Sequence, residues 1–177
     1  MKTIIKKFFF SFIIVLLLGI VFIIKPETGI SAVKNIGLSL KEVFFVLPAI
    51  FILIGLLDVW VPREIMIKQM GKKSGIKGIL LAFGLGSFAA GPLYAAFPIA
   101  GILLKKGASL VNILIFIGAW STTKIPMFMF EYSALGARFA VTRLIVDIPV
   151  IVIIATVLNL AVSDIEKNKI YVHAENF

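Results

Sequence analysis

Two interrupted apolar runs hold the residues whose types and spacing could do chemistry. The first is an uncharged run over residues 78–104, and it contains Gly91, Pro92, Tyr94 and Pro98. The glycine and the prolines predict a broken helix. In lipid, such a break is tolerated where it is buried in protein or lines a cavity, and transporters build solute sites from discontinuous helices. Its helix ends could bind an anion, and the Tyr94 hydroxyl could orient a solute or hydrogen-bond a neighbouring helix.

The second interrupted run places a charge inside an apolar segment. Lys124 lies two residues before Pro126 and directly follows three hydroxyl side chains, those of Ser121, Thr122 and Thr123. An ionisable group at membrane depth costs at least about 2.5–3.5 kcal/mol, so it usually faces the protein interior and pairs. We expect Lys124 to line a solute pathway, with snorkelling to the interface as the alternative. The carboxylates that could pair with it are those of Glu131, Asp147 and Asp58.

Three further charges could form an ion pair or couple transport to protons. Arg143 and Asp147 are four residues apart, which favours a pair on one helix face, although Asp147 could instead be a proton-coupling carboxylate. Glu131 lies near the end of its apolar segment, where an interfacial position is expected.

The composition defines an integral membrane protein. The 177 residues are 60% hydrophobic and only 15% charged, with a mean hydropathy of +1.10, whereas soluble domains are about a quarter charged. The net charge of +9 comes from short basic clusters between apolar runs. This pattern is typical of charges near anionic headgroups and argues against nucleic acid as a partner. The absence of cysteine excludes thiolate sites, and the lone His173 predicts no metal site, so no cofactor is expected.

The expected fold is an all-α membrane bundle in one domain over residues 1–163, followed by a polar tail at 164–177 that is frayed or surface-bound. Polar links join the hydrophobic segments, at 25–42, at 63–77 and in a tight turn at 105–107. The first segment is expected to be an uncleaved membrane helix. Five hydrophobic segments are predicted, at about residues 8–24, 43–61, 76–104, 110–130 and 144–162.

The third segment has two interpretations, and the fourth is also interrupted. As one helix, residues 76–104 would be about 39 Å long at 1.5 Å per residue, longer than a hydrocarbon core of about 30 Å. The segment is therefore either a broken, tilted crossing or a re-entrant hairpin. The distribution of lysine and arginine is more uneven with a hairpin, which mildly favours it. A weak bias would instead suit a protein inserted in both orientations.

Small residues also recur at helical spacing in this segment. Ala82, Gly86 and Ala90 lie at i, i+4 and i+8. Close packing of helices through small faces is the alternative to a functional role for this pattern.

Three motifs in order resemble a family of predicted permeases that includes the ArsP-type organoarsenical efflux permeases. The resemblance covers about residues 79–143. It rests on Gly91-Pro-Leu-Tyr-Ala-Ala-Phe-Pro98 with the basic-Gly turn ending at Gly107, on Ala119-Trp-Ser-Thr-Thr-Lys-Ile-Pro126, and on Leu135-Gly-Ala-Arg-Phe139 with Arg143.

The resemblance implies a half-length member of that family, because typical members are about twice as long and have two related halves. It then implies a homodimer, with parallel or antiparallel protomers, that rebuilds the two-repeat architecture in a prokaryotic plasma (inner) membrane. Many members carry cysteines in the first break, where this chain has Tyr94, Ala95 and Ala96. Capture of arsenic by thiolates is therefore not transferred.

The leading functional hypothesis is a membrane permease subunit that moves a small, unidentified solute between the two broken segments. The alternative is a non-transporting membrane scaffold or accessory subunit of a larger complex, which small-residue faces would also suit. An enzyme is not expected, because Asp58 and Asp147 are the only candidate catalytic pair and neither lies in a Gly-x-Gly-Asp context. The sequence predicts neither the direction of transport nor its energy source.

Overall fold

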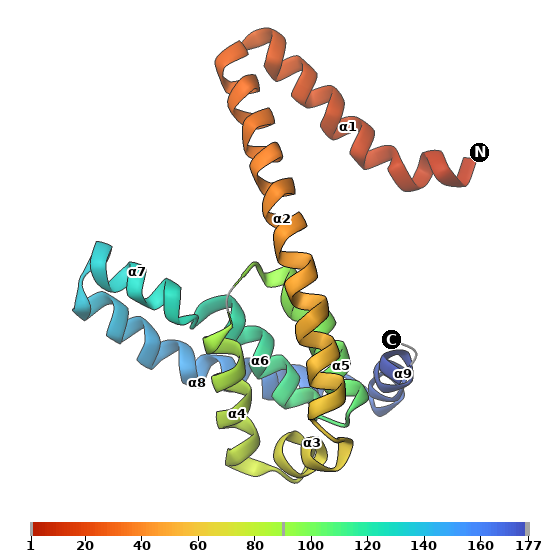
Figure 1. Cartoon of the computed structure of the whole chain (residues 1–177), viewed down its shortest axis with the longest axis vertical. Coiled ribbons are helices and arrows are strands. Elements are labelled where there is room, and N and C mark those ends of the chain that lie inside the picture. Colours follow the sequence, from red (N-terminus) through yellow and green to blue (C-terminus); the bar gives the residue numbers. More distant parts are fainter. Residues whose placement is uncertain (1, 90, 176–177) are drawn as a thin grey trace. The chain divides into compact units, whose positions relative to one another are not determined.

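The computed structural model describes the backbone of residues 2–89 and 91–175, and the side chains of these except 2–8, 10–11, 42, 54, 57 and 58. The described residues form helices and no strand, and they divide into two compact units, Met1–Pro48 and Ala49–Phe177. The helices in Figure 1 are α1 (Lys2–Ile24), α2 (Pro26–Trp60), α3 (Arg63–Met70), α4 (Gly75–Phe88), the 3-10 turn η1 (Leu93–Ala95), α5 (Ala96–Lys105), α6 (Leu110–Thr122), α7 (Ile125–Leu135), α8 (Ala137–Ala161) and α9 (Asp164–Glu175).

The first unit contains α1 and the beginning of α2. The polar link expected at 25–42 is helical from Pro26 onward, as part of α2. Pro26 suits a first helical position, where no N–H is needed, and no further proline follows before Pro48. Gly29 lies directly against Phe22, since a Cβ at Gly29 would come within 2.6 Å of that ring.

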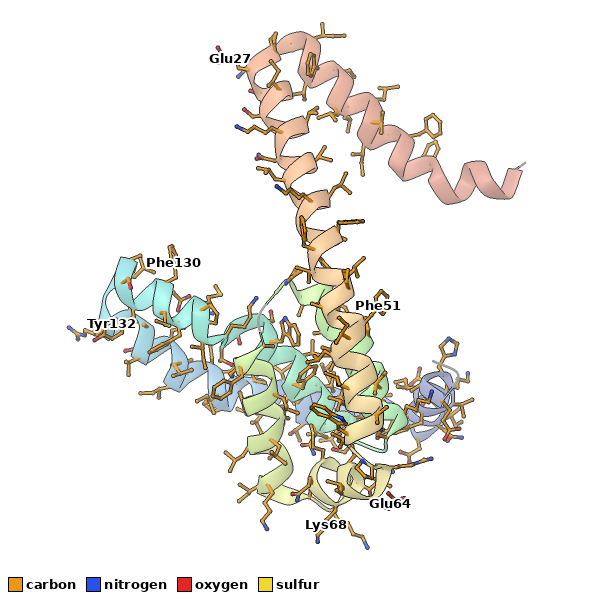
Figure 2. All side chains as sticks on the ribbon, viewed as in Figure 1. Glu27, Phe51, Glu64, Lys68, Phe130 and Tyr132 are labelled. Carbon is orange, nitrogen blue, oxygen red and sulfur yellow. The ribbon has the colours of Figure 1, made fainter. Side chains whose placement is uncertain are left out.

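Three candidate membrane spans occur among the described residues, and together they indicate an integral membrane protein. They are Pro26–Leu53, Leu110–Leu135 and Ala137–Ala161. The other expected segments correspond to shorter apolar helices, Phe12–Ile24, Gly75–Phe88 and Leu93–Lys105. Exposed apolar side chains project from the candidate spans, as Figure 2 shows for Phe130 and Tyr132 on α7.

The second unit is built around the contact between α4 and α6, the most extensive helix pair of the chain. The buried face of α4 consists of Gly78, Ala82 and Gly86. A Cβ on Gly86 would lie 2.5 Å from the carbonyl oxygen of Phe116, so the two backbones are in direct contact. The expected small-residue packing is therefore present at positions 82 and 86, while Ala90 lies outside the described residues.

Both ends of the expected third segment meet at the polar end of this unit. The helix α5 ends in a Schellman motif, in which the Ala108 N–H donates to Leu103 O and the Gly107 N–H donates to Leu104 O. Gly107 has φ +91°, which requires glycine. The Ser109 N–H then donates to Met70 O at 2.8 Å, which joins the start of α6 to the end of α3.

The C-terminal tail forms the helix α9 and is not frayed, while a surface-bound tail, the other expectation, stays a prediction. A capping box begins α9: the Ser163 N–H donates to Glu166 Oε2 at 3.1 Å, and the Glu166 N–H donates to Ser163 Oγ at 3.3 Å. Ser163 Oγ also donates to Glu166 Oε2 at 2.9 Å. This bond and the one from the Ser163 N–H lower the pKa of the Glu166 carboxyl. Tyr171 fixes the helix in place, because its hydroxyl accepts from Leu110 N–H at 3.0 Å and donates to Ala108 O at 3.2 Å.

Adding one methyl group to the α4–α6 contact tests its importance. We expect Gly86→Ala to reduce the free energy of unfolding by about 1–3 kcal/mol, because the new Cβ overlaps the backbone of α6. Gly84→Ala is the matched control, since no atom lies within 4 Å of its Cβ. Unfolding of the purified protein in mixed detergent micelles measures both. Equal stability of the two variants would contradict the close backbone contact.

Candidate functional site

The break after α4 has its carbonyl satisfied by side chains of α6 and of the link after it. Gly91 adopts φ +119°, a conformation that favours glycine, and Pro92 follows in extended conformation. The Gly91 carbonyl accepts a hydrogen bond from Lys124 Nζ at 2.9 Å and a second from Trp120 Nε1 at 3.3 Å. These bonds satisfy the backbone group that the break removes from the helix ladder.

The second break lies between α6 and α7 and uses hydroxyl groups. Thr123 Oγ1 donates to Ala119 O at 3.1 Å and lies 2.9 Å from Ser87 Oγ on α4. Thr122 Oγ1 donates to Gly118 O at 2.9 Å. Pro126 then falls in the first turn of α7, where its missing N–H costs nothing. Both threonine hydroxyls thus bond back to carbonyls within α6.

Lys124 therefore contacts the opposite break rather than an acid. Its hydrogen-bond partner is the neutral Gly91 carbonyl, whereas Glu131 and Asp147, two of the expected partners, both pair with Arg143. The side chain of Asp58, the third, lies outside the described residues. Among the described side chains, the Lys124 ammonium has no carboxylate partner.

Arg143 is the centre of an ion cluster that joins three helices. It pairs with Glu131 on α7 and, at 3.3 Å, with Asp147 one turn along α8. Its Nη2 also donates to Thr122 O, the last residue of α6, at 2.9 Å. The side chain of Glu131 is only 9% exposed, so it lies inside the protein against Arg143. The i,i+4 pair expected from the sequence is present, with Glu131 as an additional member.

The remaining predicted site residues lie at the edges of these breaks. Tyr94 belongs to η1, is 41% exposed and makes no hydrogen bond to another described residue. Pro98 falls in the first turn of α5, and Ser121 is exposed near the end of α6. Sequence analysis missed Trp120 and Ser87, because an indole and a hydroxyl in apolar runs give no sign of partners on another segment.

These features define an all-helical membrane protein with two interrupted segments held together by polar contacts. A family model described as "Predicted permease" (ArsP_1) matches residues 29–176. The chain belongs to this family of predicted permeases, which suggests a membrane transporter. No curated protein and no solved structure matches the chain.

Removing the cation of the ion cluster should leave a buried carboxylate without its partner. We expect Arg143→Met to destabilise the protein by about 3–5 kcal/mol, as when one member of a buried ion pair is lost. Arg63→Met, at an exposed position whose ion pair with Glu175 is solvated, should change stability little.

Unfolding in mixed micelles measures the effect, and Arg143→Met combined with Glu131→Gln should recover part of the loss because it removes the unpaired charge. A double variant as unstable as the single one would contradict pairing with Glu131.

Proposed function

We propose that the chain is a permease subunit whose solute pathway is lined by the breaks at Gly91–Pro98 and Ser121–Pro126. The observation that carries the proposal is the contact between Lys124 Nζ and the Gly91 carbonyl at 2.9 Å. It places a cation and a freed backbone group at one point, and discontinuous helices are where transporters hold their solutes. In this proposal the chain transports a solute and catalyses no reaction.

The solute is proposed to be a small anion. Lys124 contacts a neutral carbonyl, so its charge is uncompensated by the described side chains. A unit anion at about 4 Å would gain about 4 kcal/mol at an effective dielectric constant near 20. The Gly91 carbonyl would hold the ammonium in the empty state, and the anion would replace it as partner.

The third segment is proposed to be a re-entrant hairpin. The support is that the residues flanking the segment are joined to each other. The Ser109 N–H and Asn112 Nδ2, which follow it, both donate to Met70 O, which precedes it, at 2.8 Å. Lys106 Nζ also donates to Val61 O at 2.7 Å. With α4 and α5 entering and leaving at the same surface, the break would lie at the tip of the hairpin, inside the membrane.

A second copy of the chain is proposed to complete the pathway. A groove of about 570 Å³ runs along α8, a candidate span, and its lining includes Arg138, Thr142, Arg143 and Asp147. Polar and charged side chains in a span normally face protein or a water-filled cavity, so this side of α8 favours coverage by another protomer. A homodimer would place two sets of breaks around one pathway. The prokaryotic plasma membrane is the proposed location.

Transport in proteoliposomes tests the role of Lys124. The probes are labelled phosphate, sulfate and acetate, with glycerol and methylammonium as neutral and cationic comparisons. We expect uptake of at least one anion, and a loss of at least about tenfold in Lys124→Met, since 1.4 kcal/mol corresponds to a factor of ten. Lys124→Arg should retain more flux because it keeps the charge.

Lys105→Met is the matched control, because Lys105 lies at the end of α5 opposite the first break. It should transport like the original protein. Equal anion flux in Lys124→Met and the original protein would exclude the proposed site. Flux of none of the probes by the original protein would favour the scaffold alternative.

Cross-linking tests the proposed dimer face. Because the chain has no cysteine, Thr142→Cys gives a single reactive position in the groove, and a short bis-maleimide should link two protomers in membranes. Ile153→Cys, on an exposed part of α8 outside the groove, should give little dimer. Comparable cross-linking from both positions, or from neither, would contradict the proposed face.

A further inference from the structure

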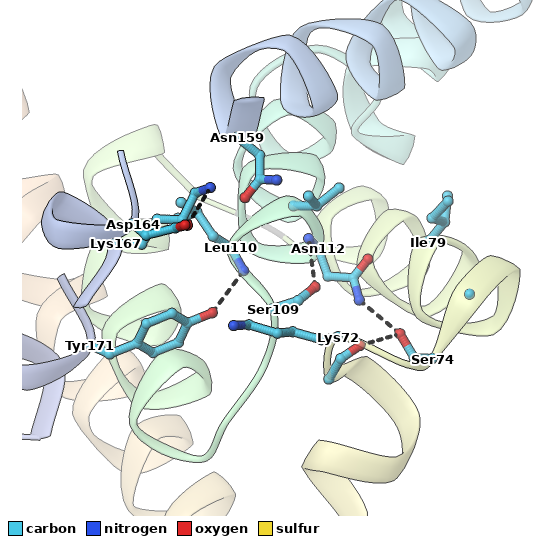
Figure 3. A pocket seen from close by; sticks show the side chains of 13 residues that line it. Lys72, Ser74, Ile79, Ser109, Leu110, Asn112, Asn159, Asp164, Lys167 and Tyr171 are labelled. Atoms are coloured by element: carbon cyan, nitrogen blue, oxygen red, sulfur yellow. Dashed lines mark hydrogen bonds and ion pairs between the residues drawn. The ribbon is translucent and has the colours of Figure 1, made fainter. Parts of the chain in front are cut away.

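A polar pocket lies at the opposite end of α6 from the break, where α6 begins and α8 ends. Its volume is about 450 Å³, within the range of ligand sites. Leu110 begins one candidate span and Ala161 ends another, so the pocket lies at the level expected for lipid headgroups. Figure 3 shows its lining, which includes Lys72, Ser74, Ser109, Asn112, Asn159 and Lys167.

The pocket carries a net positive charge. Lys72 makes no ion pair with another described residue. Lys167 pairs with Asp164 at 3.3 Å, but the Asp164 side chain is 97% exposed and remains solvated. A neighbouring pocket shares these three residues and adds Lys169. Basic pockets between membrane helices are typical sites for anionic headgroups.

The first turn of α6 adds a backbone donor to this charge. The Leu110 N–H is used by Tyr171 and the Asn112 N–H by Ser109 Oγ. Between them, the Val111 N–H has no hydrogen-bond partner among the described residues, and Val111 lines the pocket. The positive end of the α6 dipole therefore faces the same space as the two lysines.

Asn112 supplies an acceptor whose direction is fixed. It is 3% exposed, and its Nδ2 donates to Met70 O at 2.8 Å and to Ser74 Oγ at 3.0 Å. Because Met70 O can only accept, this bond defines which end of the amide is nitrogen. Asn112 Oδ1 has no hydrogen-bond partner among the described residues. Every fully buried side-chain oxygen that the structure describes does have a partner, so Oδ1 is not fully buried. It is accessible from the pocket that Asn112 lines.

We propose that this pocket binds a phosphate ester that also carries a hydroxyl group, as in the headgroup of phosphatidylglycerol. The phosphate would contact Lys72 and Lys167, and the Val111 N–H would donate to it. The hydroxyl would donate to Asn112 Oδ1. The headgroup of phosphatidylcholine has no net negative charge, and its quaternary nitrogen has no proton to donate. It should therefore bind more weakly than the headgroup of phosphatidylglycerol. The site is separate from the proposed solute pathway and does not depend on it.

Native mass spectrometry of the full chain in detergent tests the site. The probes are phosphatidylglycerol and phosphatidylcholine with the same acyl chains. We expect phosphatidylglycerol to bind more tightly than phosphatidylcholine. The double variant Lys72→Gln with Lys167→Gln should weaken phosphatidylglycerol binding by at least about tenfold, because each lysine contributes a factor of about five. The matched control is Lys73→Gln with Lys77→Gln. Both are exposed lysines on the same loop and helix start, and neither lines this pocket.

Competition with glycerol 3-phosphate separates two sources of the same chemistry. Displacement of the lipid, or binding of the soluble ester with the same dependence on Lys72 and Lys167, would assign the site to the phosphate ester itself. Lysine-dependent lipid binding without displacement would assign it to a headgroup held together with its acyl chains. Both results support the site.

Equal losses in the two double variants would reduce the effect to surface charge and overturn the proposal. Equal affinity for the two lipids would overturn it as well. The melting temperature of each variant is measured first. If the Lys72→Gln and Lys167→Gln double variant does not fold, Lys72→Gln is compared with Lys73→Gln, because Lys72 makes no ion pair in the described part of the chain.

Discussion

The carbonyl group of Gly91 is the constraint on which the second unit depends. A helix interrupted in an apolar protein leaves backbone groups that must be bonded, since an unsatisfied buried group costs about 1–3 kcal/mol. Here the carbonyl is bonded from outside its own segment, by Trp120 and Lys124. The first break therefore requires α6 and its link to lie beside it. The glycine and alanine face of α4 makes this possible by allowing close approach to α6.

This arrangement separates two cations that look alike in the sequence. Arg143 is compensated by two carboxylates and a carbonyl, and its bonds join α6, α7 and α8. Arg143 therefore stabilises the packing of these three helices. Lys124 has one carbonyl and an adjacent break, and its partner could be exchanged for an anion without leaving a carboxylate unpaired. This difference in charge compensation is the physical reason for proposing that Arg143 stabilises the fold and that Lys124 binds the solute.

The sequence predicts the features that depend on local chemistry and misses those that depend on distant partners. The helix breaks follow from proline and glycine, and the turn at Gly107 follows from its basic-glycine pattern. The bond from Lys124 to Gly91 spans 33 residues, and no periodicity connects the two positions. The helical tail was predictable from Ser163 and Glu166, whose spacing is that of a capping box. The polar link expected at 25–42 is helical because glycine is the only helix-breaking residue that it contains after Pro26.

On the proposed re-entrant topology, the two ends of α6 have different tasks. Its C-terminal end meets the break and contributes hydroxyls, and the Lys124 ammonium follows two residues beyond Thr122. Its N-terminal end meets the lysines of the loop before α4 and of α9. A hairpin returns Lys105 and Lys106 to the same surface as these lysines, so positive charge collects at one end of the unit. Positive charge of this kind sets orientation in the bilayer and attracts anionic lipid. One set of lysines would thus serve both insertion and headgroup binding, which leaves Lys124 as the cation available at the break.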